Sequence, residues 1–150
     1  MKKTILTFIL LLLFAASSNA ERIDAGFFTC DIPDAETWRM YDAESGAKNI
    51  IRADGRIAIS VALIDPKGAS LYEVADSLAR LHGSNGLKKP AWQEDDERTV
   101  WEYTTNIWGR PVYAQIFAVG KKVAYVTLVG NTMNPDAIGI FNSIEFKEDA

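Results

Sequence analysis

The chain contains one cysteine and one histidine, the side chains that most often act as a nucleophile, a base or a transition-metal ligand. Cys30 lies in the alternating stretch Phe27–Ile32 and shares one strand face with Phe28 and Ile32. We expect that face to be buried, which would make the thiol an unreactive core residue. The alternative is a redox or intermolecular thiol. A single cysteine cannot form an internal disulfide.

The histidine, His82, lies at the end of a predicted helix, where a cation interacts favourably with the helix dipole. Nucleophilic and zinc mechanisms need a histidine together with a second reactive side chain or ligand. The sequence offers no such set, because it contains one histidine and one cysteine. We therefore predict a structural role for His82, and we predict neither a metal site nor a cofactor.

The acidic residues raise two further possibilities. Glu94–Glu97 could supply oxygen ligands to a calcium ion, but the run lacks the alternating donors and central glycine of a calcium loop. We interpret it as a solvated loop. Catalytic carboxylate pairs are defined by distance in space, so a carboxylate-based hydrolase remains the least favoured hypothesis. Walker, dinucleotide, zinc and serine-hydrolase motifs are absent from the sequence, and we predict no catalytic activity.

Aromatic residues crowd the second half of the chain and are the most informative candidates for a binding site. Tryptophan and tyrosine combine apolar area with a hydrogen-bonding group, and they concentrate at binding hot spots. Trp101 and Tyr103 share one face of a predicted strand, where they form either core or binding surface. Trp108 lies in a turn, either buried or exposed, with Arg110 as a charged companion. The predicted binding residues are Trp101, Tyr103, Trp108, Arg110 and Tyr113.

Residues 1–20 have the pattern of a secretory signal peptide. Lys2 and Lys3 precede the apolar stretch Ile5–Phe14, and small residues then lead to Ala20. The apolar stretch is too short to span a bilayer comfortably, which disfavours an uncleaved anchor. We predict cleavage after Ala20 and a location in the periplasm or outside the cell.

Residues 21–150 are expected to form one domain, because this length supports a hydrophobic core and no linker interrupts it. Without Lys2 and Lys3 the formal charge changes from −4 to −6. An acidic domain gains nothing from contacts with the phosphate backbone of DNA or RNA, so nucleic acid is not an expected partner. No further long apolar run follows, so we expect no membrane-spanning segment after cleavage.

The hydrophobic pattern of this domain predicts a sheet and two helices. Strands are predicted over residues 27–32, 38–43, 48–53, 56–65, 99–105, 110–119 and 123–129, with a weak strand over 87–93. A helix follows the capping box of Ser70 and Glu73 and ends at Gly83, and a second begins at Asn134. Small residues on one face of the 56–65 strand favour a helix close against it. Local hairpins dominate, so we predict an α+β domain with a mainly antiparallel sheet flanked by helices.

The opening of this domain resembles the PsbP-like proteins, in which a strand of the type F-x-x-x-x-P leads to a tryptophan. Phe28, Pro33 and Trp38 stand in those places, and the segment Phe141–Ile144 fits the terminal helix of the family. The resemblance covers nearly all of residues 26–147. The family includes extrinsic photosystem II subunits, a nuclear-import factor that binds a small GTPase, and bacterial periplasmic DcrB-like proteins. It implies an α/β/α sandwich and non-enzymatic work, since members mostly bind or help assemble other proteins.

These observations predict an exported, non-enzymatic protein that binds a partner or assists assembly at the cell envelope. The alternative is a module that holds a small molecule or envelope ligand between sheet and helix. That alternative predicts a closed apolar cavity of roughly several hundred cubic ångströms, lined by tryptophan and tyrosine. The identity of the partner or ligand does not follow from the sequence.

Overall fold

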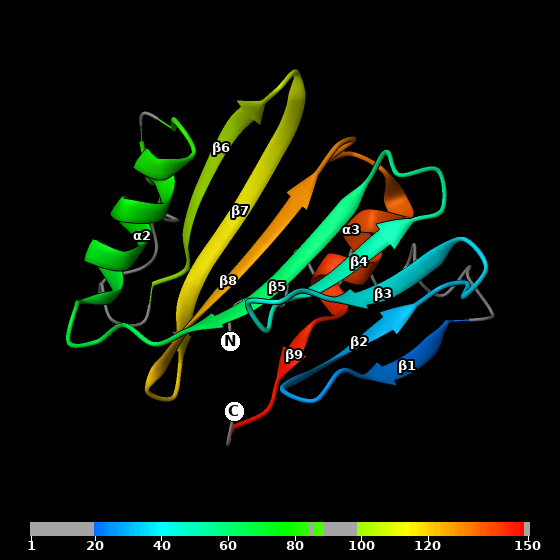
Figure 1. The fold of residues 1–150 in the computed structure, drawn as a ribbon, viewed down its shortest axis with the longest axis horizontal. Helices are drawn as coiled ribbons and strands as arrows, with labels where there is room; N and C mark the ends of the chain where they lie inside the picture. The colour runs from blue at the N-terminus through cyan, green and yellow to red at the C-terminus, as the bar shows by residue number, and fades with distance from the viewer. Residues whose placement is uncertain (1–19, 85, 89–98, 149–150) are drawn as a thin grey trace.

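The computed structural model describes residues 20–84, 86–88 and 99–148. Residues 1–19 of the predicted signal peptide and the acidic run 94–97 lie outside the described residues. The described part contains two helices and nine strands, and the strands form two antiparallel sheets (Figure 1). This arrangement confirms the predicted α+β class. No helix in these ranges is long and apolar enough to cross a membrane.

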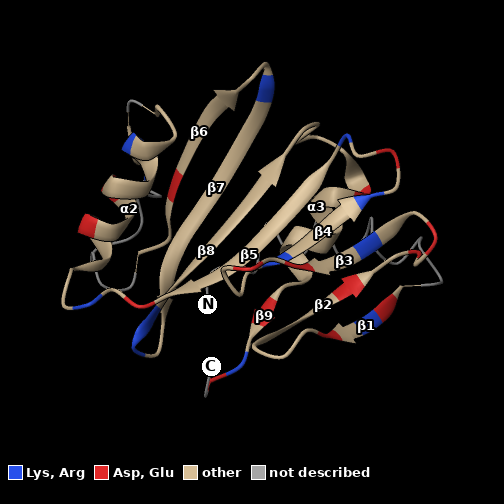
Figure 2. Ribbon diagram, in the orientation of Figure 1, with Lys and Arg blue, Asp and Glu red and all other residues tan. Residues whose placement is uncertain are grey.

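The larger sheet has six strands in the order β3-β4-β5-β8-β7-β6. Its strands are β3 (Trp38–Asp42), β4 (Lys48–Arg52), β5 (Ala58–Ile64), β6 (Trp101–Ile107), β7 (Arg110–Val119) and β8 (Lys122–Val129). Every neighbouring pair is antiparallel, and each of these strands was predicted to within a few residues. Charged residues lie mainly at the strand ends and around the edge of the sheet (Figure 2). The uncharged centre suits strands that are covered on at least one face.

One face of the six-stranded sheet is covered by the smaller sheet and by α3 (Pro135–Ser143). The smaller sheet consists of β1 (Glu21–Asp24), β2 (Phe28–Ile32) and β9 (Glu145–Phe146), in the order β1-β2-β9. Phe28, Cys30 and Ile32 point into the resulting core and are 0%, 0% and 5% exposed, as the alternation of their strand predicted. The helix begins at the predicted cap, since the side chain of Asn134 accepts a hydrogen bond from the amide of Ala137.

The opposite face carries α2 (Leu71–Leu81), which begins with the predicted capping box of Ser70 and Glu73. Leu71, Ala75 and Ala79 are buried on its inner side. They pack against residues of β6, β7 and β8, namely Trp101, Tyr103, Ala114, Ile116 and Val123. The helix therefore lies at the β6–β7 side of the sheet, to the left in Figure 1.

The expectation that a helix covers the small face of the 56–65 strand is wrong for most of that strand. Ala58, Ser60 and Ala62 are partly exposed, and from β5 only Ile64 packs against the α2 core. The small side chains thus form a partly exposed surface of the sheet that no helix in the described part of the chain covers. Small residues allow a close approach but do not require one.

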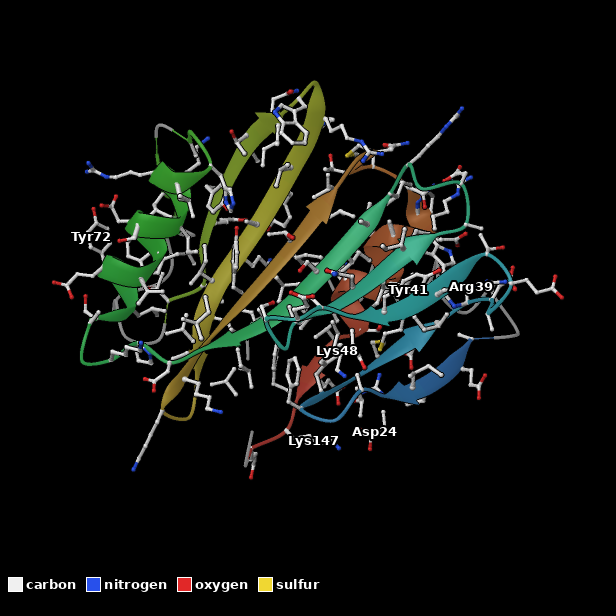
Figure 3. The ribbon with its side chains drawn as sticks, viewed as in Figure 1. Asp24, Arg39, Tyr41, Lys48, Tyr72 and Lys147 are labelled. Atoms are coloured by element: carbon white, nitrogen blue, oxygen red, sulfur yellow. The ribbon has the colours of Figure 1, made fainter. Side chains whose placement is uncertain are left out.

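Strands β1 and β9 were not predicted, and both depend on pairing with β2. Arg22 of β1 holds them together, because its guanidinium forms ion pairs with Asp31 at 3.1 Å and Glu145 at 2.9 Å. A third ion pair joins Lys147 to Asp24 at 2.8 Å, at the edge of the small sheet (Figure 3). Of the weak strand predicted over 87–93, the described part is a single bridge between Lys88 and Glu102.

Candidate functional site: an apolar pocket between the sheet and α3

A pocket of about 530 Å³ opens between the end of the β6–β7 hairpin and α3. Thr104, Pro111 and Tyr113 line it on the sheet side, and Ile138 and Phe141 line it on the helix side. The loop between β8 and α3 contributes Thr132 and Met133. The walls are mostly apolar, and this size is typical of small-molecule sites. The pocket lies where sheet and helix meet, as the ligand-binding alternative requires. It is open to solvent rather than closed, and its described lining includes Tyr113 but no tryptophan, so that part of the expectation is wrong.

A chain of hydrogen bonds fixes the tyrosine that forms one wall of the pocket. The Tyr113 hydroxyl donates to the Glu102 carboxylate, and the Gln115 side-chain amide donates to the same hydroxyl at 2.9 Å. The β6–β7 register pairs Glu102 with Gln115, and Tyr113 shares their face because it is two residues before Gln115. Both hydrogen-bonding functions of the Tyr113 hydroxyl are therefore used within the protein.

The surroundings of Tyr113 keep its phenol neutral. Burial raises the pKa of Tyr113, and the hydrogen bond to the Glu102 carboxylate raises it further. A smaller hollow of about 190 Å³ shares Thr104 and Tyr113 with the pocket and adds Lys88 and Glu102. Lys88 and Glu102 thus lie beside the apolar pocket. The described residues that line the pocket itself carry no charged side chain.

A second polar cluster lies on the opposite face, between the end of α2 and the sheet. The His82 ring nitrogen Nδ1 is 2.7 Å from the Tyr103 hydroxyl and 2.9 Å from the Tyr125 hydroxyl. The two hydroxyls are 2.5 Å apart. Burial raises the pKa of both tyrosines. These contacts tie the helix end to β6 and β8, an arrangement consistent with a structural part for His82.

The five predicted binding residues do not converge on one site. Trp101 is 7% exposed and Tyr103 is 1% exposed, and both pack on the α2 face. Tyr113 lines the pocket on the opposite face. Trp108 is 98% exposed in the hairpin turn, and Arg110 donates a hydrogen bond to the carbonyl oxygen of Gly55 at 2.8 Å.

Sequence reasoning missed several residues that build the pocket. Gln115 and Met133 drew no attention, because a lone glutamine in a strand and a lone methionine in a loop carry no distinctive signal. Phe141 begins the segment that fits the terminal helix of the PsbP-like family, and this was the signal that could have pointed to the pocket. The strand pairing that brings Glu102 against Tyr113 was not available from spacing alone.

The described residues contain no group of three or more histidine, cysteine or carboxylate side chains that could hold a metal ion. Cys30 lies on β2 of the small sheet with its side chain buried in the core, and burial raises the pKa of its thiol to about 11. A thiol with that pKa is not a nucleophile near neutral pH.

Comparison with known proteins gives a fold and no activity. No protein-family model matches the chain, and no curated protein matches it. Among solved structures, a protein from Bacteroides thetaiotaomicron VPI-5482 is similar, with a TM-score of 0.52 and 10% sequence identity. The similar region covers 87% of this chain and 49% of that one, so this chain spans about half the length of its structural neighbour. At this identity the likeness concerns the fold alone.

Proposed function

We propose that the protein is an exported, non-enzymatic binding protein of the cell envelope, and that its pocket holds a small apolar molecule. The observation that carries this proposal is the pocket of about 530 Å³ between sheet and helix. Export rests on the signal-peptide pattern of residues 1–20. A location in the periplasm or outside the cell follows from it.

The polarity of the pocket supports an uncharged ligand body. Thr104, Pro111, Ile138 and Phe141 offer mainly carbon to a bound molecule. The Tyr113 hydroxyl is engaged by Glu102 and Gln115, so an apolar ligand would leave this hydroxyl with its partners. Burial of apolar surface would then provide most of the affinity.

Two other functions have weaker support. Assistance in the assembly of another protein agrees with the resemblance to PsbP-like proteins, and the exposed Trp108 offers a contact for a protein partner. A carboxylate-based hydrolase needs two converging acids. Among the described residues that line the pocket there is no carboxylate.

The ligand proposal is tested with residues 21–150 and the neutral fluorescent probe N-phenyl-1-naphthylamine. We expect the probe to become brighter on binding, and we expect Thr104→Trp to abolish this because its ring fills the pocket. Thr104 is exposed on β6, so the domain should tolerate both Thr104→Trp and the matched control Thr104→Val, which keeps the pocket open.

The outcomes of this experiment separate the hypotheses. Probe binding that survives in Thr104→Trp would place the site elsewhere, and no binding to the wild type would overturn the proposal. Native mass spectrometry of the protein purified from its own host then identifies the natural occupant. A second polypeptide in place of a small molecule would favour the assembly role.

A further inference from the structure

The β6–β7 hairpin carries a tryptophan at a turn position where the backbone conformation disfavours a bulky residue. Trp108 and Gly109 form a two-residue turn, since Ile107 pairs with Arg110. Their φ angles are +50° and +78°, both in the left-handed region. Turns of this kind favour asparagine followed by glycine, and a bulky residue is strained at the first position. The local backbone therefore gives no reason for a tryptophan here.

Burial gives no reason either. The Trp108 side chain is 98% exposed, whereas tryptophan is highly buried on average. Met133, in the loop between β8 and α3, is 77% exposed and also lines the pocket. The hairpin turn and this loop project from the same end of the molecule (Figure 1). Two large apolar side chains thus stand in solvent at this end of the molecule, and one of them, Met133, also lines the pocket.

Cationic side chains flank these apolar groups. Arg110 contacts the Gly55 carbonyl oxygen at 2.8 Å, which joins the hairpin to the turn that also carries Arg56. Asp54 in that turn faces Arg52, with Nε and Oδ2 3.4 Å apart. Asp136, in the first turn of α3, is the opposing acid at this end. The arginines provide positive charge on a chain whose formal net charge is −4.

We propose that this end docks on the surface of a lipid bilayer, and we call Arg56, Trp108, Arg110 and Met133 the tip surface. Tryptophan and methionine can enter the boundary between headgroups and acyl chains, and arginine can contact lipid phosphates. The tip surface fits a bilayer better than a protein partner. Its side chains project from separate loops, and a fluid lipid surface can adapt to each of them. A stable protein interface needs a continuous area of roughly 800 Å² on each side.

The biological use of this docking rests on the proposed function. The hairpin residues Thr105 and Pro111 line the pocket, and Trp108 lies three residues beyond each of them. An apolar molecule could then pass between the bilayer and the pocket with little exposure to water. The ligand class inferred is a molecule that partitions into membranes.

The test measures sedimentation of residues 21–150 with vesicles of phosphatidylcholine and phosphatidylglycerol. We expect Trp108→Asn to lower the partition coefficient by about tenfold or more, because the largest inserting side chain is lost. The same variant should unfold at equal or higher urea concentration, since asparagine suits the turn. Tyr41→Thr is the matched control, because Tyr41 is an aromatic residue 49% exposed on β3, away from the tip surface (Figure 3).

Each remaining outcome contradicts the proposal that the tip surface docks on a bilayer. Unchanged vesicle binding in Trp108→Asn, or an equal loss in Tyr41→Thr, would overturn the tip surface. Failure of the wild type to sediment would do the same, as would a polypeptide that co-purifies with the wild type and not with Trp108→Asn. Probe binding reports on the pocket separately, since we expect Thr104→Trp to lose the probe and keep the vesicles.

Discussion

At the scale of single residues, Gly130 shows how closely two strand ends approach. It follows β8 with a φ of +106°, and its amide donates to the Pro111 carbonyl oxygen at 2.9 Å. A Cβ added at this position would lie 2.2 Å from the backbone oxygen of Arg56. A larger residue at position 130 would therefore displace the backbone that leads into β5.

We expect Gly130→Ala to lower the free energy of unfolding by about 2 kcal/mol or more, from the clash together with the strained φ. Gly46→Ala is the matched control, because Gly46 has a φ of +87° and no atom lies within 4 Å of its added Cβ. The control should lose about 1 kcal/mol, the conformational part alone. Urea unfolding measures both, and equal losses would show that the close approach is unimportant.

Cys30 gives a prediction about pH. Burial raises the pKa of its thiol to about 11, whereas an unfolded thiol ionises near pH 9. As the pH rises through this window, the unfolded chain loses its proton first, so the folded state loses stability. We expect the free energy of unfolding of the wild type to fall more steeply between about pH 9 and 11 than that of Cys30→Ala.

Labelling provides an independent check on Cys30. Iodoacetamide should react with the thiol in urea and leave the native protein unlabelled at pH 8. Labelling of the native protein at the rate seen in urea would mean that Cys30 is accessible, and the redox alternative would regain support.

At the scale of elements, α2 is anchored to the sheet at its last turn. The Tyr103 hydroxyl contacts both the His82 ring and the Tyr125 hydroxyl. We expect Tyr103→Phe to lower the free energy of unfolding by about 1 kcal/mol, because it removes two hydrogen bonds of the cluster while the contact between His82 and Tyr125 remains. Tyr41→Phe on β3 serves as the control and should have no effect in thermal or urea unfolding. A silent Tyr103→Phe would mean that apolar packing alone holds the helix.

The sequence predicted most elements because their signals are local. The capping box of Ser70 and Glu73 and the alternation of β2 and β7 need no knowledge of the partner strand. Strands β1 and β9 have four and two residues, too short for a period, and they exist through pairing with β2. Short strands of this kind are specified by the whole fold.

The candidate site depended on strand register, which spacing does not reveal. Tyr103 pairs with Ala114, so its side chain shares that residue's face and Tyr113 points to the other. A register shifted by one residue would have placed both tyrosines together. The predicted aromatic site was divided between two faces for this reason, and the pocket became visible only in three dimensions.

At the scale of the whole molecule, phenylalanine rings join the two sheets. Phe146 of β9 lies with its ring centroid 5.5 Å from Phe117 of β7 and 6.1 Å from Phe28 of β2. We expect Phe146→Ala to lower the free energy of unfolding by about 2 kcal/mol, because its ring is partly buried between the sheets. Leu81→Ala, at a position 75% exposed, should change it by less than about 0.5 kcal/mol.

Calorimetry distinguishes a local from a global effect of Phe146→Ala. A single transition at lower temperature would show that the two sheets unfold together. A new early transition would show that the small sheet is an independent unit, contrary to the shared core described above.

The small sheet also has a consequence for the time at which the chain can fold. Phe28 pairs with Phe146, so a core residue near the start of the domain gains its strand partner only after nearly all of the chain has been synthesised. Contacts this distant in sequence form slowly, because the intervening chain must first be ordered. A nascent chain that has not yet reached β9 lacks the partner that completes its core. Such a chain would remain incompletely folded during synthesis, and an incompletely folded polypeptide can be threaded through a narrow channel.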